Sequence, residues 1–262
     1  MISVICAYND RLVLDEYLIK SLNTQQAAYE PILLDNTDRT FSAAARALNT
    51  GGLLAHGKYL MFVHQDVRLC SPDWLGTAEQ TLDQVADVGI AGVAGMSEDG
   101  RNNQERRRNI ILEHEDPVRT WGNAITQPEV VQTVDECLTI VPKDVFEVMK
   151  FDEKTCDGWH HYAVDYSLTA RVQGLAVIVL PLLVHHRSLG FSRKLTLKMN
   201  SIGEIQRYNR SLGRLVAKHK ALYEWIYTTN GDYCTSRSAL YQDLRRLPEI
   251  IPQQFLRGKS GR

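Results

Sequence analysis

Four groups of polar side chains follow directly after short apolar runs in this sequence, where predicted strands would end. The groups are residues 8–10 (YND), 35–38 (DNTD), 64–66 (HQD) and 185–186 (HH). Because ligands of an open parallel sheet bind at the carboxyl ends of its strands, we expect these side chains to meet along one rim. That rim would offer carboxylate, amide and imidazole groups to a polar ligand.

Asp66 and one histidine are the candidate ligands for a metal ion. Hard cations such as Mg²⁺ and Mn²⁺ prefer carboxylate oxygen, bridge diphosphate oxygens and leave other positions to water or one imidazole. Asp66 comes soon after the apolar run KYLMFV, and His185 and His186 follow the last apolar run. A histidine at a strand end more often makes ordinary hydrogen bonds, but a loop aspartate from another strand favours a metal site. The spacing matches neither HExxH nor a compact zinc motif.

Two further aspartates each have a functional and a structural interpretation. Asp35 follows PILL, and its carboxylate would accept hydrogen bonds from a base or ribose, or close an Asx-turn. Asp165 begins a predicted helix, where it would either complement the helix dipole or act as a general base toward an acceptor hydroxyl.

Known phosphate-binding loops are absent from the sequence. The first apolar run ends in CAYNDR rather than GxGxxG, and no GxxxxGK[ST] motif occurs. A dinucleotide site or P-loop is therefore disfavoured, and phosphates would be held by a metal ion. The five cysteines form no CxxC pair, which is typical of free thiols in a reducing compartment.

The first hundred residues alternate between apolar strand-like runs and helical periodicity, which predicts a doubly wound α/β unit with parallel strands. The predicted strands cover residues 1–7, 31–34, 58–63 and 89–94, and the predicted helices cover residues 11–24, 41–56 and 74–85.

Residues 97–127 break this pattern with a polar, charge-dense stretch, which predicts a long loop acting as a lid or a disordered segment. Its run Arg106 to Arg108 is either a solvated face or a binder of phosphate or of an acidic acceptor. Regular structure resumes with strands in 129–141, helices at 143–149 and 165–173, and an apolar strand at 175–184. Helices are predicted at 202–227 and near 238–247.

Charge and hydropathy exclude some classes of function. The 262 residues include 30 basic and 31 acidic ones, a formal net charge of −1, so no overall field favours nucleic acid or an anionic membrane. The apolar runs are far shorter than the roughly 20 residues of a membrane span, and no secretory signal is expected. We expect a cytoplasmic protein. The basic C-terminal helices would cover an acceptor cleft, mediate a homo-oligomer or touch a membrane surface.

Several segments together resemble the family 2 glycosyltransferases. ISVICAYND, ILLDNTD and ALNTGGLLAHGKYLMFVHQDV occur in that family's order and approximate spacing, and the last carries its Asn-x-Gly and Ala-x-Gly-x-Tyr patterns. VDECLTIVPKDVFEVMKFDE and DGWHHYAVDYSLTARVQG extend the resemblance to about residue 195. The resemblance implies a GT-A fold, with three α/β/α layers around a mostly parallel central sheet.

This resemblance also implies a division of the chain. Residues 1–195 would form the GT-A domain, with a nucleotide-binding half at 1–96, the loop at 97–127 and an acceptor-binding half at 128–195. Residues 196–262 would form a helical extension.

Roles for individual residues follow from the same resemblance. Asp66 would bind the metal, Asp165 would be the catalytic base, and His186 or His185 would complete the metal site, with the ending HRSLG favouring His186. The expected contacts to the donor come from Ala7, Tyr8, Asn9, Asp35, Asn36, Asn49 and Gln65. The expected contacts to the acceptor come from Trp159, His160 and Tyr162.

The implied activity is an inverting, Mn²⁺- or Mg²⁺-dependent transfer from a nucleotide sugar, carrying UDP or dTDP, to a glycan, lipid-linked or protein-linked acceptor. The chain has His64-Gln65-Asp66 where the family usually has Asp-x-Asp, and Val164-Asp165 where it usually has Glu-Asp. The missing carboxylate motivates a second hypothesis, a nucleotide-sugar-binding scaffold without turnover. A nucleotidyltransferase is disfavoured, because CAYNDR lacks a Gly- and Lys-rich phosphate loop.

Overall fold

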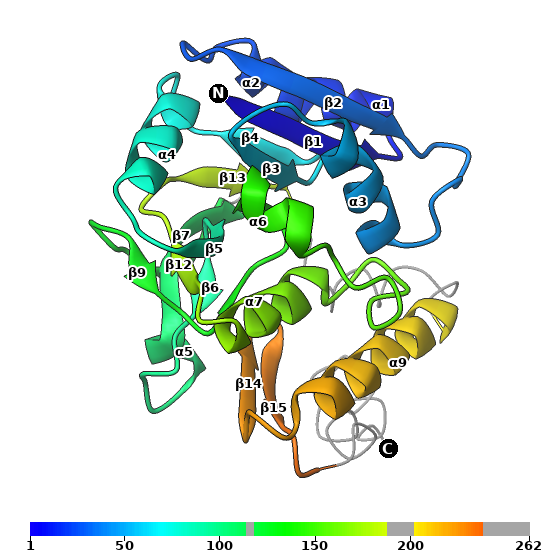
Figure 1. The fold of residues 1–262 in the computed structure, drawn as a ribbon. Coiled ribbons are helices and arrows are strands. Elements are labelled where there is room, and N and C mark those ends of the chain that lie inside the picture. The colour runs from blue at the N-terminus through cyan, green and yellow to red at the C-terminus, as the bar shows by residue number, and fades with distance from the viewer. Residues whose placement is uncertain (114–117, 188–201, 238–262) are drawn as a thin grey trace, which may run out of the picture.

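A computed structural model describes residues 1–113, 118–187 and 202–237. Its centre is a seven-stranded sheet that the helices cover (Figure 1). In spatial order, the strands of this sheet are β2 (Tyr29–Asp35), β1 (Ile2–Tyr8), β3 (Tyr59–Val63), β11 (Leu138–Pro142), β5 (Val88–Gly92), β12 (Ala176–Val179) and β9 (Glu129–Val130).

Most strands of the central sheet run parallel, as expected. β1 pairs in parallel with both β2 and β3, and β5 pairs in parallel with β12. β11 is inserted antiparallel between β3 and β5, and β9 is an antiparallel edge. The predicted three-layer α/β/α class is confirmed, and the carboxyl ends of β1, β2 and β3 lie together at one edge.

Alternating side chains of the central strands pack into two separate apolar cores. Val4 of β1 belongs to one core and Ile5 to the other, because successive strand residues point to opposite faces. The first core is covered by α1 (Arg11–Leu14), the π-helical turn η1 (Asp15–Ile19), α2 (Lys20–Leu22) and α4 (Trp74–Asp83). The second core is covered by α3 (Ala44–Leu54), α6 (Lys143–Val148) and α7 (Tyr162–Val172).

A second sheet replaces the loop expected at residues 97–127, so that prediction was wrong. Its path is β10 (Thr133–Val134), β6 (Gly95–Met96), β7 (Arg107–Glu113), β13 (Val184–His186) and β4 (Val67–Leu69), with β8 (Arg119–Asn123) paired to β7 and α5 (Asn103–Arg106) before it. Buried Asn109 explains how a polar segment joins the fold, since its amide donates to the Val93 and Leu182 carbonyls, both at 2.8 Å.

The three consecutive arginines of this segment make contacts within the protein. Arg106 lies over the Tyr227 ring, 4.1 Å from its centroid. Arg108 forms an ion pair with Glu129 at 2.8 Å, and Arg107 lies over the Trp121 ring. These contacts hold β7 to its neighbours, which favours a structural role for the run over phosphate binding.

The C-terminal part that the structure describes consists of a helix and a hairpin. α9 (Ile202–His219) ends earlier than the predicted 202–227, because β14 (Trp225–Thr228) and β15 (Gly231–Cys234) form an antiparallel pair. Leu212 and Leu215 of α9 pack in a third apolar cluster with Leu168 of α7. The helix predicted near 238–247 lies outside the described residues.

Gly52 of α3 supplies a test of the second core. A Cβ at Gly52 would overlap the buried Phe146 ring, whereas one at Gly76 of α4 would lie 3.6 Å from Ala27 Cβ. We therefore expect Gly52→Ala to destabilise the fold by about 1–3 kcal/mol through overpacking. The control Gly76→Ala should be neutral or slightly stabilising, since alanine is the better helix former. Urea unfolding of both variants tests this, and equal stabilities would contradict the packing described.

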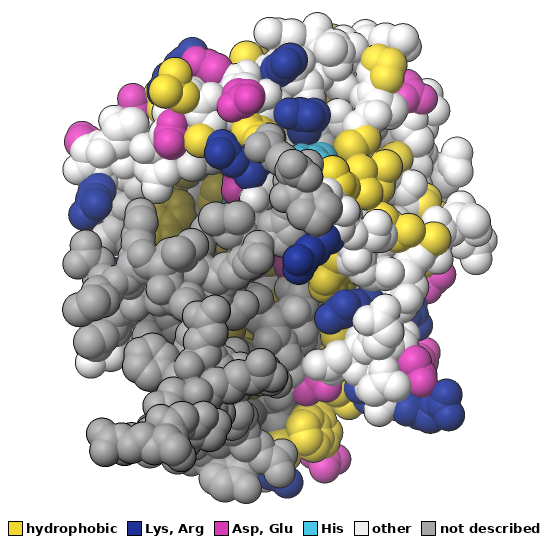
Figure 2. All heavy atoms as spheres, turned by 180° about the vertical axis from the view of Figure 1, so that it is seen from behind, with side chains coloured by type: hydrophobic (Ala, Val, Ile, Leu, Met, Phe, Trp, Pro, Cys, Tyr) yellow, Lys and Arg dark blue, Asp and Glu magenta, His cyan; other side chains and the backbone are white. Residues whose placement is uncertain are grey.

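Within residues 1–113, 118–187 and 202–237, no helix combines the length and apolarity that crossing a bilayer requires. Figure 2 shows acidic and basic side chains interspersed on the visible part of one face, in keeping with the near-zero net charge.

Candidate metal and donor site

Gln65 joins the carboxyl ends of β1 and β3. Its Oε1 accepts hydrogen bonds from the backbone N–H groups of Asn9 and Asp10 at 2.9 and 3.0 Å. Its Nε2 donates to Asn9 Oδ1 at 2.8 Å. Asp10 in turn caps α1 by accepting from two backbone N–H groups. Two of the four predicted polar groups therefore meet at the rim.

Asp35 connects a third polar group to the same rim. The Tyr8 hydroxyl donates to Asp35 Oδ2 at 2.9 Å, and Thr37 donates to Oδ1 from its backbone N–H and its hydroxyl. The Thr37 backbone N–H, then its hydroxyl and Tyr8, lower the pKa of Asp35, so this exposed carboxylate is ionised at neutral pH. Asp35 thus closes a turn and also lies at the rim, so the structural and the functional interpretation of this residue are compatible.

Three side chains converge next to this rim. His64, Asp66 and His186 can each offer one ligand atom, and these atoms lie within 4.8 Å of one another. His64 and Asp66 follow β3, and β13 brings His186 to them by pairing with Val67 of β4. The distance from His186 Nε2 to Asp66 Oδ1 is 3.4 Å.

The alternation of β13 separates the two adjacent histidines. His186 lies with Asp66, whereas the His185 ring stacks on Tyr17, with centroids 6.3 Å apart and planes 15° apart. Consecutive strand residues point to opposite faces, so the geometry supports His186 rather than His185 as the ligand.

His186 also shows how strongly Asp66 acts on this cluster. Burial by itself lowers the pKa of His186, but the hydrogen bond and negative charge of Asp66 outweigh it, and the pKa is raised. Because a metal-ligating imidazole must be neutral, a bound cation would compete with a proton at this ring.

The donor set fits a divalent cation. Two imidazoles and one carboxylate on partly buried side chains leave further coordination positions for water or a ligand. Mg²⁺ strongly prefers oxygen ligands, so of the two expected metals the set favours Mn²⁺. His64 was not among the ligands predicted from sequence, although its spacing of two residues from Asp66 was a usable signal.

Tyr162 supports the cluster instead of forming part of an open acceptor surface. Its side chain is buried, and its hydroxyl lies 3.1 Å from His64 Nε2 and donates to the Glu136 carbonyl at 2.9 Å. Burial, followed by the nearby Glu136 carboxyl, raises the pKa of Tyr162 well above its usual value. The hydroxyl therefore stays protonated and fixes the His64 ring, which differs from the expected acceptor contact.

Asp165 has an environment that differs from the one expected of a catalytic base. It is 2% exposed, and its two oxygens accept from His219 Nε2 and Lys218 Nζ of α9, both at 2.8 Å. The carboxylate is thus enclosed between α7 and α9 and is not open to an acceptor. Sequence reasoning could not anticipate this, because the two partners lie more than fifty residues further along the chain.

Three of the expected donor contacts are held within the protein. The Asn36 amide makes two hydrogen bonds with the Phe41 backbone. Asn49 donates to the Phe151 carbonyl and accepts from the Phe151 N–H, so both amides hold loops in place. Ala7 lies inside β1, opposite Leu34 of β2.

The sequence matches a known protein family over most of its length. The family model described as "Glycosyltransferase like family" matches residues 3–199, about three quarters of the sequence. The chain belongs to this family. Comparison with curated protein sequences gives no significant match.

Solved structures of glycosyltransferases share the fold of this family member. The mannosyltransferase PcManGT of Pyrobaculum calidifontis, solved with GDP-Man and Mn²⁺, has a TM-score of 0.55 at 14% identity, over 84% of this chain and 64% of its own. GalNAc-T7, solved with UDP, GalNAc and Mn²⁺, has a TM-score of 0.52 at 9% identity, over 72% of this chain and 43% of its own. TarS of S. aureus has a TM-score of 0.50 at 14% identity, over 84% and 44%. The chain spans less than two thirds of each of these proteins.

Proposed function

We propose that this glycosyltransferase-like protein transfers a sugar from a nucleoside diphosphate sugar to an acceptor hydroxyl, by a single displacement that inverts the anomeric carbon. The observation that carries the proposal is the convergence of His64, Asp66 and His186 beside the rim formed by Asp35 and Gln65. A metal ligand set next to strand-end polar groups suits a nucleotide diphosphate.

Each part of the rim has a task in this proposal. Asp35 is ionised and accepts hydrogen bonds from the ribose or base, while Gln65 fixes the loop after β1 against the loop after β3. Asp66, His186 and His64 hold the cation, and Tyr162 keeps the His64 ring in place. A divalent cation bound there supplies positive charge to the departing diphosphate.

Binding of nucleoside diphosphates tests which nucleotide the donor carries. UDP and dTDP are implied by the resemblance to the family 2 glycosyltransferases, and GDP joins them because PcManGT was solved with GDP-Man. A ligand present at 100 times its Kd adds about 2.7 kcal/mol of stability. We expect one of UDP, GDP and dTDP to raise the Tm with Mn²⁺ present, and to lose this effect in EDTA. If none of the three raises the Tm with Mn²⁺, the proposed donor site is wrong.

A second candidate is a nucleotide-sugar-binding module without turnover. The enclosure of Asp165 by Lys218 and His219 favours it, because the expected catalytic base is not available to an acceptor. Release of nucleoside diphosphate from UDP-, GDP- and dTDP-glucose with Mn²⁺ separates the candidates. Binding without release, with water and simple sugars as acceptors, would favour the module.

A further inference from the structure

We infer that His160, oriented by Glu136, accepts the proton of the attacking hydroxyl, in place of Asp165. This inference rests on the proposed glycosyl transfer and names a residue pair that sequence reasoning did not assign as the base. His160 was expected to touch the acceptor, and Glu136 was not among the predicted site residues.

The side chains of His160 and Glu136 lie close together. His160 Nδ1 lies 3.9 Å from Glu136 Oε2. The Glu136 side chain is 14% exposed, and within the described ranges its other oxygen, Oε1, has no hydrogen-bond partner. At this separation the two groups are not directly hydrogen-bonded, but an acidic side chain on the Nδ1 side of the ring favours a proton on Nδ1 and leaves the lone pair on Nε2. The pairing therefore prepares Nε2 to take a proton.

The Tyr162 hydroxyl connects this pair to the metal cluster. The Glu136 backbone carbonyl accepts from the Tyr162 hydroxyl at 2.9 Å, and that hydroxyl lies 3.1 Å from His64 Nε2. Two contacts thus join the His160 and Glu136 pair to the residues that would hold the donor's diphosphate. A base for the acceptor has to lie beside the donor, and these contacts connect the pair to the proposed donor site.

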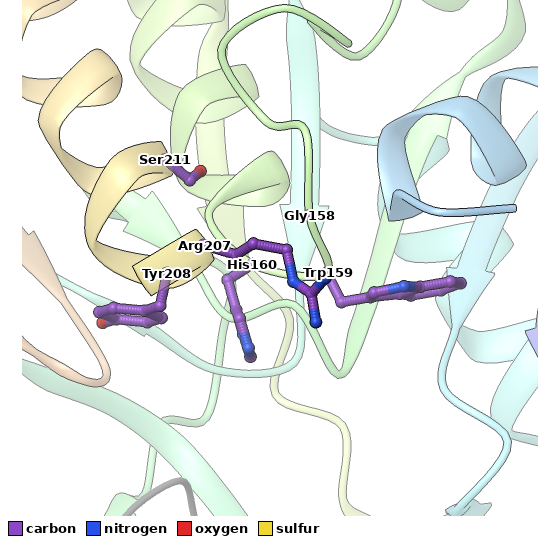
Figure 3. Close-up of a pocket in the computed structure, with 6 residues that line it drawn as sticks. All are labelled: Gly158, Trp159, His160, Arg207, Tyr208 and Ser211. Atoms are coloured by element: carbon purple, nitrogen blue, oxygen red, sulfur yellow. The ribbon is translucent and has the colours of Figure 1, made fainter. Parts of the chain in front are cut away.

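A pocket lies beside His160. Trp159, His160 and Gly158 line a small pocket, partly open to solvent, with Arg207, Tyr208 and Ser211 of α9. Figure 3 shows the Arg207 side chain reaching from α9 across to the loop, with the His160 ring beside it and the Trp159 indole extending away from α9. Trp159 is 39% exposed, which suits stacking against a sugar ring. An acceptor in this pocket would lie against His160.

The proton affinity of Glu136 is consistent with this role. Burial, and then the negative charge of Asp135, raise the pKa of Glu136 well above its usual value, and the backbone N–H groups of His161 and Tyr162 only partly offset this. A carboxyl group with a raised pKa is a stronger base than an ordinary one. Glu136 can therefore take up the Nδ1 proton as His160 Nε2 gains the proton of the acceptor.

The chemical step balances without any further reactant. The acceptor O–H bond breaks and its proton passes to His160 Nε2. The acceptor oxygen forms the new bond to the anomeric carbon on the face opposite the leaving group. The bond from the anomeric carbon to the phosphate oxygen breaks, and its electron pair leaves with the nucleoside diphosphate.

Chemical rescue provides the test. Release of nucleoside diphosphate is measured with water as the acceptor, using the full chain, Mn²⁺ and UDP-, GDP- or dTDP-glucose, whichever nucleotide binds. We expect His160→Ala and His160→Gln to lower kcat by about 100-fold or more, with donor binding in the thermal-shift assay unchanged. Added imidazole should restore much of the rate to His160→Ala. Glu136→Gln should lower kcat while leaving the donor KM unchanged.

A second imidazole–carboxylate pair in the chain supplies the matched control. His56 Nδ1 lies 2.7 Å from Glu30, on an exposed histidine outside the rim. His56→Ala should keep the parent rate and show no response to imidazole. An unchanged rate in His160→Ala, or a loss that imidazole does not restore, would overturn the inference. Absence of nucleotide binding by the parent protein would instead refute the proposed function.

Discussion

Asp66→Asn is expected to abolish metal-dependent nucleotide binding while leaving the fold intact. Asp66 is the one carboxylate of the cluster, and its negative charge both attracts a cation and raises the pKa of His186. Loss of residues that merely support metal ligands costs 10- to 100-fold in metal affinity, so loss of this ligand should cost more than about 100-fold. Titration of Mn²⁺ and nucleoside diphosphate by calorimetry measures the effect.

Asp38→Asn is the matched control for this experiment. Asp38 also follows β2 near the rim, but its carboxylate accepts only from Thr40 among the described residues. We expect Asp38→Asn to bind metal and nucleotide as the parent does. Equal loss in both variants would point to a general effect of charge, and unchanged binding by Asp66→Asn would remove Asp66 from the site.

Asp165→Asn is expected to destabilise the protein by about 3 kcal/mol. Breaking a buried ion pair costs about 3–5 kcal/mol because a buried charge is left uncompensated. The lower end applies here, since Lys218 is 32% exposed at its side chain and keeps Asp152 at 3.0 Å. The free energy of unfolding in urea measures this cost, and a role limited to catalysis predicts no change in it.

The nearby ion pair of Asp157 and Arg214 provides a more exposed control for this stability measurement. This pair also connects α9 to the loop before α7, with an N–O distance of 2.8 Å, but its side chains are 33% and 39% exposed. We expect Asp157→Asn to cost less than about 1 kcal/mol, as is usual for surface ion pairs. If both variants lose the same stability, the buried contact of Asp165 has no special role.

Local patterns predicted the parts of the fold that local physics determines. The alternation of apolar strands and helices gave β1, β2, β3 and β5 with their helices, because each element buries one face on its neighbour. β11 could not be assigned as an antiparallel insertion, since its apolar sequence fits either direction between β3 and β5. Residues 97–127 were predicted as a loop because their side chains are polar, yet β7 pairs with β8 and β13.

The part of the site that directly follows the strands could be predicted from the sequence. Asp35, Gln65 and Asp66 were recognised from their positions after apolar runs, and the structure brings them to one rim. Which of His185 and His186 faces Asp66 depends on the register of β13 with β4, which residue types alone do not determine. The enclosure of Asp165 and the pairing of His160 with Glu136 depend on contacts between distant segments, which local periodicity does not report.

Anomalous X-ray scattering at the manganese edge, from crystals grown with Mn²⁺ and the nucleoside diphosphate that binds, tests the central claim most directly. The proposed site predicts one strong peak within bonding distance of Asp66 and His186, next to the diphosphate, with His185 still packed on Tyr17. A manganese peak at any other set of side chains, or nucleotide bound at the rim with no peak beside Asp66, would contradict it.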